Sequence, residues 1–268
     1  MKHIGILAHS YEGATLCFHE MCAEGVRRLG PHDHPEITLT CTPMAHSLDA
    51  WDRGDHAELR SMFIADAEKL VAAGADFFVC PDNSAHIALE SPGREARSRL
   101  SPGKAASDAF PLPALHIAEV VAGQAAQDGR RKVGILGTNW TMTGPVYPGA
   151  LGRRGIDWAV PSEADRNIVH DIIMDELCLG TFSDASRDAY VAIIEKLAGE
   201  GCDCVALVCT EIPLLITQDA SPLPILDSTR LLARAAVAVA LGERPMPEWR
   251  GGPVDPAADA AWKLHHRL

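Results

Sequence analysis

Two stretches of this chain share one pattern, and that pattern decides the fold. Residues 74–83 read GADFFVCPDN, and residues 201–210 read GCDCVALVCT. Both open with Gly-x-Asp, continue as a short apolar run and end in polar residues. Each follows a segment, 58–73 or 186–200, whose apolar residues recur at helical spacing. The sequence therefore predicts a helix, a turn and a buried strand, present once in each half.

A second pair of segments supports the repeat. Residues 2–8, KHIGILA, and residues 132–138, KVGILGT, each read as a buried strand that ends in a turn. Strands that alternate with helices form parallel sheets with helices on both faces. We therefore expect an α/β fold with two pseudo-symmetric domains, each a parallel sheet flanked by helices. The active site is expected in the cleft between the domains.

The repeat also predicts how the chain is divided. Residues 1–114 together with 227–268 are expected to form the first α/β domain, and residues 115–226 the second. The segment 91–113, rich in Ser, Pro, Gly and charge, is expected to connect them as a loop or flap.

The match between the halves places Asp82 opposite Cys209, each just after a predicted strand. Ligands of parallel α/β sheets bind beyond the carboxyl ends of the strands. If the two halves face each other about a pseudo-twofold axis, both side chains meet in one cleft. Asp82 and Cys209 are therefore the candidate pair for chemistry.

Composition limits the classes of partner. The chain is 47% hydrophobic and 22% charged, with a net charge of −12. No basic stripe exists to neutralise phosphates, so nucleic acid is not an expected partner. No apolar stretch approaches the roughly 20 residues of a membrane span, and the run 4–8 is too short for a signal-peptide core. We predict a cytoplasmic protein without a membrane partner.

The eight cysteines do not predict a disulfide framework or a metal site. No Cys-x-x-Cys occurs, and most thiols are expected to be small buried apolar groups. The sequence 32–34, His-Asp-His, lies between prolines and is expected to form a surface turn rather than a metal site. No dinucleotide fingerprint or P-loop is present, so no cofactor and no metal are predicted.

The chain also resembles a known family from residue 4 to about residue 241. Several segments are similar to motifs of the aspartate/glutamate racemase family. They are IGIL at 4–7 with SYE at 10–12, PDNSAH at 81–86, EADR at 163–166, CTEIPLL at 209–215 and DSTR at 227–230. The resemblance implies a two-domain α/β enzyme that inverts the α-carbon of an amino acid without a cofactor.

The implied chemistry needs a symmetric pair of acid/base groups. One group removes the α-proton from one face of the carbon, and the other returns a proton on the opposite face. Family members use a thiolate and a thiol, and a cysteine has an ordinary pKa of about 8.5. Cys209 matches one such position. Thr210 and the backbone N–H groups after Cys209 are expected to help its ionisation.

At the other position the sequence departs from the family pattern, which usually reads Pro-Cys-Asn. Pro81 and Asn83 set the register and place Asp82 where the cysteine is expected. An aspartate is less basic than a cysteine by about 4.5 pKa units, or roughly 6 kcal/mol of proton affinity. Burial of Asp82 is expected to raise its pKa and narrow this gap. Cys80, two residues earlier, is an alternative thiol on the same side of an extended strand.

The departure leaves several functions open. The chain could be a racemase or epimerase that uses Asp82 and Cys209 and favours one enantiomer. It could use Cys209 alone to protonate an enolate in a decarboxylation. It could use Cys209 as a nucleophile in isomerisation or hydrolysis, with Asp82 orienting water or a cationic group. A non-catalytic protein that binds a small ligand is the alternative outside enzymology.

The same motifs predict the residues around the pair. Those expected to contact substrate are Ser10, Tyr11, Asn83, Ser84, Asn139, Thr141 and Thr210. Those expected to support the site are His86, His170, Glu211 and Arg53, and Arg53 could bind the distal carboxylate of an acidic substrate. Thr181 stands where some aspartate-specific members carry a lysine, which weakens the case for aspartate. The expected partners are a small carboxylate or amino acid and, from the resemblance, a second copy in a homodimer.

Overall fold

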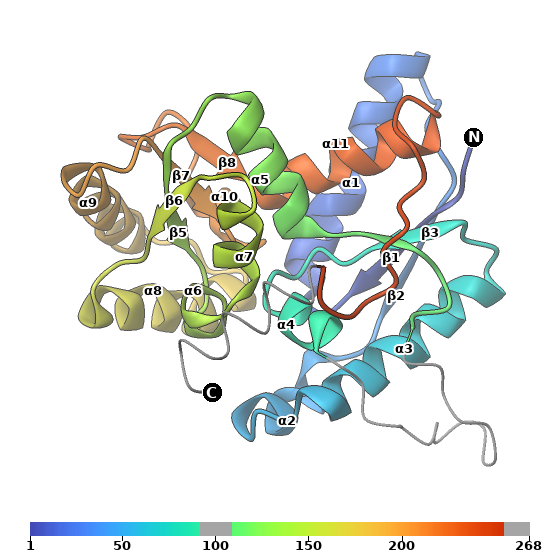
Figure 1. The fold of residues 1–268 in the computed structure, drawn as a ribbon, viewed down its shortest axis with the longest axis horizontal. Coiled ribbons are helices and arrows are strands. Elements are labelled where there is room, and N and C mark those ends of the chain that lie inside the picture. Colours follow the sequence, from blue (N-terminus) through green and yellow to red (C-terminus); the bar gives the residue numbers. More distant parts are fainter. Residues whose placement is uncertain (92–108, 255–268) are drawn as a thin grey trace.

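The computed structural model describes residues 1–91 and 109–254. Their strands form two parallel four-stranded sheets, ordered β2-β1-β3-β4 and β6-β5-β7-β8. Figure 1 shows the two sheets in separate halves of the molecule, each accompanied by helices. Because the strand order is the same in both sheets, the predicted fold of two similar α/β halves is confirmed.

The first half contains β1 (Ile4–Ala8), α1 (Tyr11–Leu29), β2 (Ile37–Cys41), η1 (Met44–His46), α2 (Leu48–Asp52), α3 (His56–Ala72), β3 (Phe77–Val79), α4 (Ala85–Glu90) and β4 (Ala114–Leu115). The second half contains β5 (Lys132–Leu136), α6 (Asn139–Thr143), α7 (Val146–Gly152), β6 (Asp157–Ala159), α8 (Glu163–Asp175), η2 (Leu177–Leu179), α9 (Asp184–Gly199), β7 (Cys204–Leu207), α10 (Ile212–Leu215) and β8 (Ile225–Asp227). Helix α5 (Ile117–Gln127) follows β4, the last strand of the first sheet, and helix α11 (Ser228–Ala240) follows β8, the last strand of the second.

The two helices that precede β3 and β7 begin slightly earlier than the apolar spacing predicts. Asp55 caps α3 by accepting from the N–H of Glu58 at 3.0 Å, and Ser183 caps α9 by accepting from the N–H of Ser186 at 3.1 Å. A side-chain acceptor at this position satisfies an N–H that the first turn leaves without a partner. The caps therefore explain the earlier helix starts.

The repeat extends to the backbone between helix and strand. Gly74 and Gly201 both have φ of 89°, a left-handed conformation that favours glycine. Two residues later, a carboxylate links each turn to the central strand. Asp76 accepts from the N–H of His3 at 2.8 Å, and Asp203 accepts from the N–H of Arg131 at 2.9 Å. The recurring Gly-x-Asp is therefore a turn that joins the third strand of each sheet to the first.

The first sheet is buried on both faces, as its continuous apolar strands require. Ile4 and Ile6 of β1 pack in the core under α1 and α11, whereas Leu7 packs in the core under α3 and α4. Helix α11 follows the second sheet in sequence but lies beside α1 (Figure 1). The second sheet has one continuous core with side chains from α5, α7, α8 and α9.

The chain crosses between the halves at β4 and β8. Leu115 pairs with Val79 in the first sheet, and Asp227 pairs with Leu207 in the second. The predicted boundaries after residues 114 and 226 thus fall inside these strands, and the division stays a prediction. Residues 92–108 of the predicted connecting segment, and residues 255–268, lie outside the described residues.

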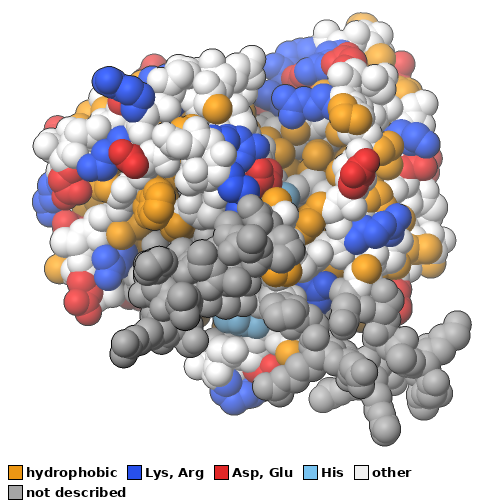
Figure 2. All heavy atoms as spheres, in the orientation of Figure 1, with side chains coloured by type: hydrophobic (Ala, Val, Ile, Leu, Met, Phe, Trp, Pro, Cys, Tyr) orange, Lys and Arg blue, Asp and Glu red, His pale blue; other side chains and the backbone are white. Residues whose placement is uncertain are grey.

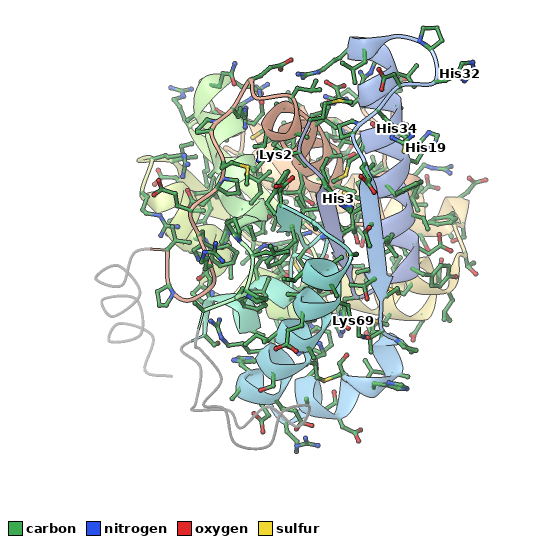
Figure 3. All side chains as sticks on the ribbon, turned by 90° about the vertical axis from the view of Figure 1, so that its right-hand side faces the viewer. Lys2, His3, His19, His32, His34 and Lys69 are labelled. Carbon is green, nitrogen blue, oxygen red and sulfur yellow. The ribbon has the colours of Figure 1, made fainter. Side chains whose placement is uncertain are left out.

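The described surface is chemically mixed. Acidic and basic side chains lie interspersed on the face that Figure 2 shows. His32 and His34 lie exposed on the loop after α1, at the edge of the molecule (Figure 3). In residues 1–91 and 109–254, no group of three or more His, Cys, Asp or Glu side chains is arranged so that it could hold a metal ion. In the same residues, no helix is long and apolar enough to cross a membrane.

Candidate active site

Asp82 and Cys209 line one cavity between the two halves, with a volume of about 40 Å³. The cavity lies at the carboxyl ends of the central strands, where parallel sheets bind their ligands. His9 follows β1, Asp82 follows β3, Thr138 follows β5 and Cys209 follows β7. The full lining comprises His9, Ser10, Met44, Leu48, Trp51, Asp82, Asn83, Ser84, Thr138, Trp140, Ile173, Met174, Cys178, Val208, Cys209, Thr210 and Glu211.

On one side of the cavity, Cys209 is held by Glu211. The thiol donates to Oε2 of Glu211 at 2.9 Å, and the Thr210 hydroxyl donates to the same oxygen at 3.1 Å. Ser10 donates to the other oxygen, Oε1. Burial, together with the nearby Glu211 carboxylate, raises the pKa of Cys209 well above its usual value. Cys209 is therefore a thiol at neutral pH, and Thr210 does not donate to its sulfur as the sequence suggests.

On the other side, Asp82 is paired with His9, a residue that lies between the motifs at 4–7 and 10–12 and belongs to neither. His9 Nδ1 lies 2.5 Å from Asp82 Oδ2, and the N–H of Ala85 donates to Oδ1 at 3.0 Å. Burial opposes ionisation of Asp82, but the charge and hydrogen bond of His9 outweigh it and lower the pKa of Asp82. The expectation that the pKa of Asp82 is raised is therefore wrong, because it considers burial without a partner.

The contact with Asp82 also changes the pKa of His9, and it does so in the opposite direction. Burial lowers the pKa of His9, yet the Asp82 carboxylate outweighs burial and leaves this pKa raised. The strand-end rule that selects Asp82 would have found His9 as well, because His9 is the residue that follows β1.

Polar side chains near Asp82 connect the two halves. The Ser84 hydroxyl lies 2.8 Å from that of Thr138 and 2.9 Å from that of Thr141, and the two threonine hydroxyls are 3.1 Å apart. Asn83 donates to Ser228 at 3.1 Å and accepts from Tyr147. Asn83 thus uses its amide to hold the halves together, and Ser84 and Thr138 line the cavity between them.

His86 supports the backbone of Asp82 from behind the cavity. Its Nδ1 donates to the carbonyl of Asp82 at 2.9 Å, and its Nε2 accepts from the N–H of Ile117 at 3.3 Å. The ring stacks on Trp249 with centroids 5.9 Å apart. Burial, with a smaller contribution from His116, lowers the pKa of His86 to about 3. His86 is therefore a neutral, structural side chain.

The other predicted residues lie outside the lining of the cavity. Tyr11 is 56% exposed, and Arg53 pairs with Glu58 at 2.9 Å on the surface. His170 accepts from the N–H of Asn139 at 3.3 Å and packs edge-on against Trp140. Cys80, the alternative thiol, is buried in the core under α3 and α4.

Apolar side chains close the remaining wall. Trp51 of the first half and Trp140 of the second lie 5.4 Å apart between ring centroids, so they meet across the cleft. Met44, Leu48 and Met174 extend this wall, and none of the described residues that line the cavity is a lysine or an arginine.

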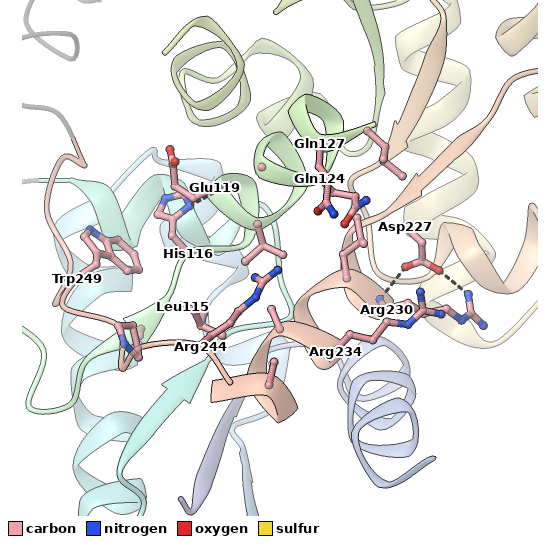
Figure 4. A pocket seen from close by; sticks show the side chains of 18 of the residues that line it. Leu115, His116, Glu119, Gln124, Gln127, Asp227, Arg230, Arg234, Arg244 and Trp249 are labelled. Carbon is pink, nitrogen blue, oxygen red and sulfur yellow. Dashed lines mark hydrogen bonds and ion pairs between the residues drawn. The ribbon is translucent and has the colours of Figure 1, made fainter. Parts of the chain in front are cut away.

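A second, larger cavity of about 860 Å³ lies between α5, α11 and the segment that follows α11 (Figure 4). Three of the arginines that line it, Arg28, Arg154 and Arg230, form ion pairs with carboxylates. Arg154 pairs with Glu119 at 2.7 Å. Arg230 pairs with Asp227 at 2.5 Å, as Figure 4 shows. No cysteine is among its described lining residues, so the smaller cavity is the better candidate for the predicted chemistry.

Comparison with known proteins agrees with this geometry. The profile of the Asp/Glu/Hydantoin racemase family matches residues 4–236. The chain is 24% identical to the broad-specificity amino-acid racemase RacX of Bacillus subtilis, over 89% of this chain and 98% of RacX. A crystal structure from Yersinia pestis, assigned as an Asp/Glu racemase, shares 32% identity with a TM-score of 0.74, covering 90% of this chain and all of that one (100%). An aspartate racemase homologue from Pyrococcus horikoshii shares 25% identity with a TM-score of 0.68, with 90% and 100% covered.

The chain therefore belongs to the Asp/Glu/Hydantoin racemase family. Its match to a curated racemase and to racemase structures makes it an enzyme, an isomerase of the amino-acid racemase kind.

Proposed function

We propose that the protein is a cofactor-independent amino-acid racemase or epimerase that moves the α-proton between Asp82 and Cys209. The observation that carries the proposal is their common cavity. The two side chains reach it from equivalent strand ends of the two halves, so they can face opposite sides of one bound carbon. Inversion of an α-carbon requires an acid/base group on each side.

The protonation states of the two side chains fit these roles, with Asp82 as the proton acceptor and Cys209 as the proton donor. Asp82 is ionised, because His9 lowers its pKa, so the side chain carries no proton of its own and has a free lone pair for the α-proton. Cys209 is a thiol and can return a proton to the opposite face, because burial and Glu211 raise its pKa. When the C–H bond breaks, its electron pair moves into the substrate carboxylate as an enediolate. The hydroxyls of Ser84 and Thr138 can turn toward this group, and such donors stabilise developing charge most when they are already in place.

The lining favours an amino acid with an uncharged side chain over aspartate or glutamate. Two carboxylates, Asp82 and Glu211, already face the cavity, and no described lysine or arginine lines it. Arg53, the expected partner of a distal carboxylate, is paired at the surface. The tryptophan pair instead offers an apolar wall.

Substrate entry requires the two halves to separate. The cavity of about 40 Å³ has room for a few waters, because one water needs about 10 to 15 Å³ of such a volume. An amino acid is larger than that. Opening at the tryptophan pair would admit it, and closure would exclude water from the reacting carbon.

The experiment is α-deuterium exchange in D2O, followed by proton NMR over a panel of L- and D-amino acids with acidic, polar and apolar side chains. We expect exchange and loss of optical activity with an uncharged amino acid, and no exchange after Cys209→Ala. Cys41→Ala is the matched control, because Cys41 is exposed on β2 and does not line the cavity.

Other outcomes separate the alternatives. Release of CO2 from a substituted malonate without exchange would favour the single-thiol decarboxylase. Turnover without exchange would favour isomerisation or hydrolysis through Cys209. Binding without any turnover would favour a ligand-binding protein. The cytoplasmic location and the homodimer stay predictions.

A further inference from the structure

A chain of three hydrogen bonds ends on the carboxylate of Asp82. The Ser47 hydroxyl lies 2.8 Å from the carbonyl oxygen of Met44, to which it donates. His9 Nε2 lies 2.6 Å from the same hydroxyl, and His9 Nδ1 lies 2.5 Å from Asp82 Oδ2. The three hydrogen bonds thus link η1 to the residue after β1, and that residue to Asp82 after β3.

These three hydrogen bonds determine which atoms carry protons. A serine hydroxyl has one proton, and Ser47 uses it toward Met44, so it can only accept from His9 Nε2. Nε2 therefore carries a hydrogen. The 2.5 Å contact between Nδ1 and the carboxylate must then contain a second proton, because two lone pairs do not approach so closely. The pair of His9 and Asp82 holds that proton jointly.

We propose that His9 and Asp82 act as one proton-holding unit opposite Cys209, in which Asp82 contacts the substrate and His9 sets the proton affinity. Both His9 nitrogens are occupied by Ser47 and Asp82, so His9 acts through Asp82 as a positioning residue. The inference rests on the proposed function for its catalytic consequence. The proton shared by the pair can be tested without a substrate.

The unit addresses the mismatch between aspartate and cysteine. A lone aspartate binds a proton about 4.5 pKa units more weakly than a cysteine, a factor of roughly thirty thousand. Removal of the shared proton instead leaves a neutral imidazole whose Nδ1 lone pair faces a carboxylate. The pair loses this proton with a pKa at or above that of histidine. The ordinary pKa of histidine is only about 2 units below that of cysteine, which is a factor of roughly a hundred in proton affinity. The unit is therefore a stronger base than a lone aspartate by about 2 to 3 pKa units, and it remains a weaker base than Cys209, whose pKa burial and Glu211 raise.

The proton balance closes for one inversion. When the unit has lost its shared proton, it takes the α-proton, which comes to lie between Asp82 and His9 as the C–H bond breaks. The electron pair forms the enediolate. The S–H bond of Cys209 then breaks, its proton forms the new C–H bond on the opposite face, and a thiolate remains. The reverse reaction uses the thiolate as base and the protonated unit as acid.

The other ionisable groups around the unit do not replace it. Asp66 on α3 and Glu211 after β7 are carboxylates whose charge favours protonated His9. His86 on α4 is buried and neutral, with its pKa lowered to about 3 by burial and His116. The thiols Cys80 and Cys178 have pKa values raised by burial. Around neutral pH, the shared proton of His9 and Asp82 is therefore the one expected to titrate.

The catalytic test compares pH profiles of kcat and KM for α-proton exchange in wild-type protein and in His9→Asn, whose amide can still donate to Asp82 but cannot titrate. In wild type, we expect the ascending limb of kcat above pH 6.5. In His9→Asn, we expect the ascending limb below about pH 5 and a kcat about 10- to 100-fold lower than in wild type. The KM of this variant is expected to stay within about threefold of the wild-type value. His3→Asn is the control, because His3 is a buried histidine next to the opposite end of β1. An unmoved limb in His9→Asn would overturn the proposal.

A second measurement needs neither substrate nor a folded His9 variant. NMR titration of the wild-type imidazoles should show one ring, assigned to His9 by its loss in His9→Asn or by through-bond connectivity, with a pKa above 6.5. Asp82→Asn should lower that pKa. A His9 ring that titrates below 6.5, or that ignores Asp82→Asn, refutes the shared proton. If the titration is as expected but no amino acid exchanges, the unit stands and the proposed function fails.

Discussion

The substitution Gly13→Ala tests whether the close approach of the two halves positions Cys209. Gly13 lies in the first turn of α1, in the first half. A Cβ placed on it would lie 1.9 Å from Oγ1 and 2.3 Å from Cβ of Thr210, the residue after Cys209. Its φ is not in the left-handed region, so the added methyl group causes a contact problem and no backbone strain.

The size of the effect follows from these distances. Non-bonded heavy atoms pack at about 3.5 Å, so α1 and the Thr210 segment must separate by about 1 to 1.5 Å. Thr210 is buried, and its own Cβ is part of the overlap, so a rotamer change cannot relieve it. Overpacking of this kind costs about 1 to 3 kcal/mol of unfolding free energy. A displacement of about 1 Å beside Cys209 is expected to lower kcat roughly 100-fold.

The assay pairs urea denaturation with α-deuterium exchange. Gly199→Ala is the matched control, because Gly199 is the last residue of α9 and an added Cβ there meets no atom within 4 Å. The control should be neutral or more stable by up to about 1 kcal/mol. If Gly13→Ala stays within about 0.5 kcal/mol of wild type and within twofold in kcat, the contact between α1 and Thr210 does not position the thiol.

Three further outcomes can be measured. Asp82→Cys should keep at least about a tenth of the exchange rate, since a thiol beside His9 can still transfer a proton, whereas Asp82→Asn should lose about 100-fold or more; equal losses would count against an acid/base role. Burial and the nearby His116 lower the pKa of His86 to about 3, below the usual 6.5. As the pH decreases from 6.5, the unfolded chain therefore binds a proton at His86 before the folded protein does, and the stability of the fold decreases. Between pH 6.5 and 4.5 the group contributes a loss of about 2 to 3 kcal/mol, and His86→Asn should flatten the slope seen by urea denaturation. Tyr147→Phe removes a buried hydrogen bond between the halves and should cost about 1 to 3 kcal/mol and also lower kcat, whereas Tyr190→Phe, which loses a bond within the second half, should lower stability alone.

Much of the fold was predictable because its signals are local. Gly74 and Gly201 end their helices in the same backbone conformation, and the carboxylates of Asp76 and Asp203 make the same contact two residues later. Such turns need particular residues at particular spacings, so they are visible as a repeat. The helix starts shifted because a cap depends on one side chain just outside the apolar pattern.

The candidate site was predictable only in part. Asp82 and Cys209 lie two or three residues after the ends of their strands, and the strand-end rule places them in the cavity. The contact between His9 and Asp82 depends on the parallel pairing of β1 with β3, in which Ile6 lies beside Val79. Periodicity predicts each strand but not which strands are neighbours. The sign of the pKa shift at Asp82 could not follow from burial alone for the same reason.

The sequence by itself determined the class of fold, the family resemblance and the replacement of an expected thiol by Asp82, because each is carried by residues close together in the chain. Only the tertiary structure decided what Asp82 can do. It brought His9 to that carboxylate and Ser47 to His9, left Arg53 at the surface and closed the cleft with Trp51 and Trp140. Proton affinity and substrate selection depend on charges and surfaces within a few ångströms, and those neighbours come from distant parts of the chain.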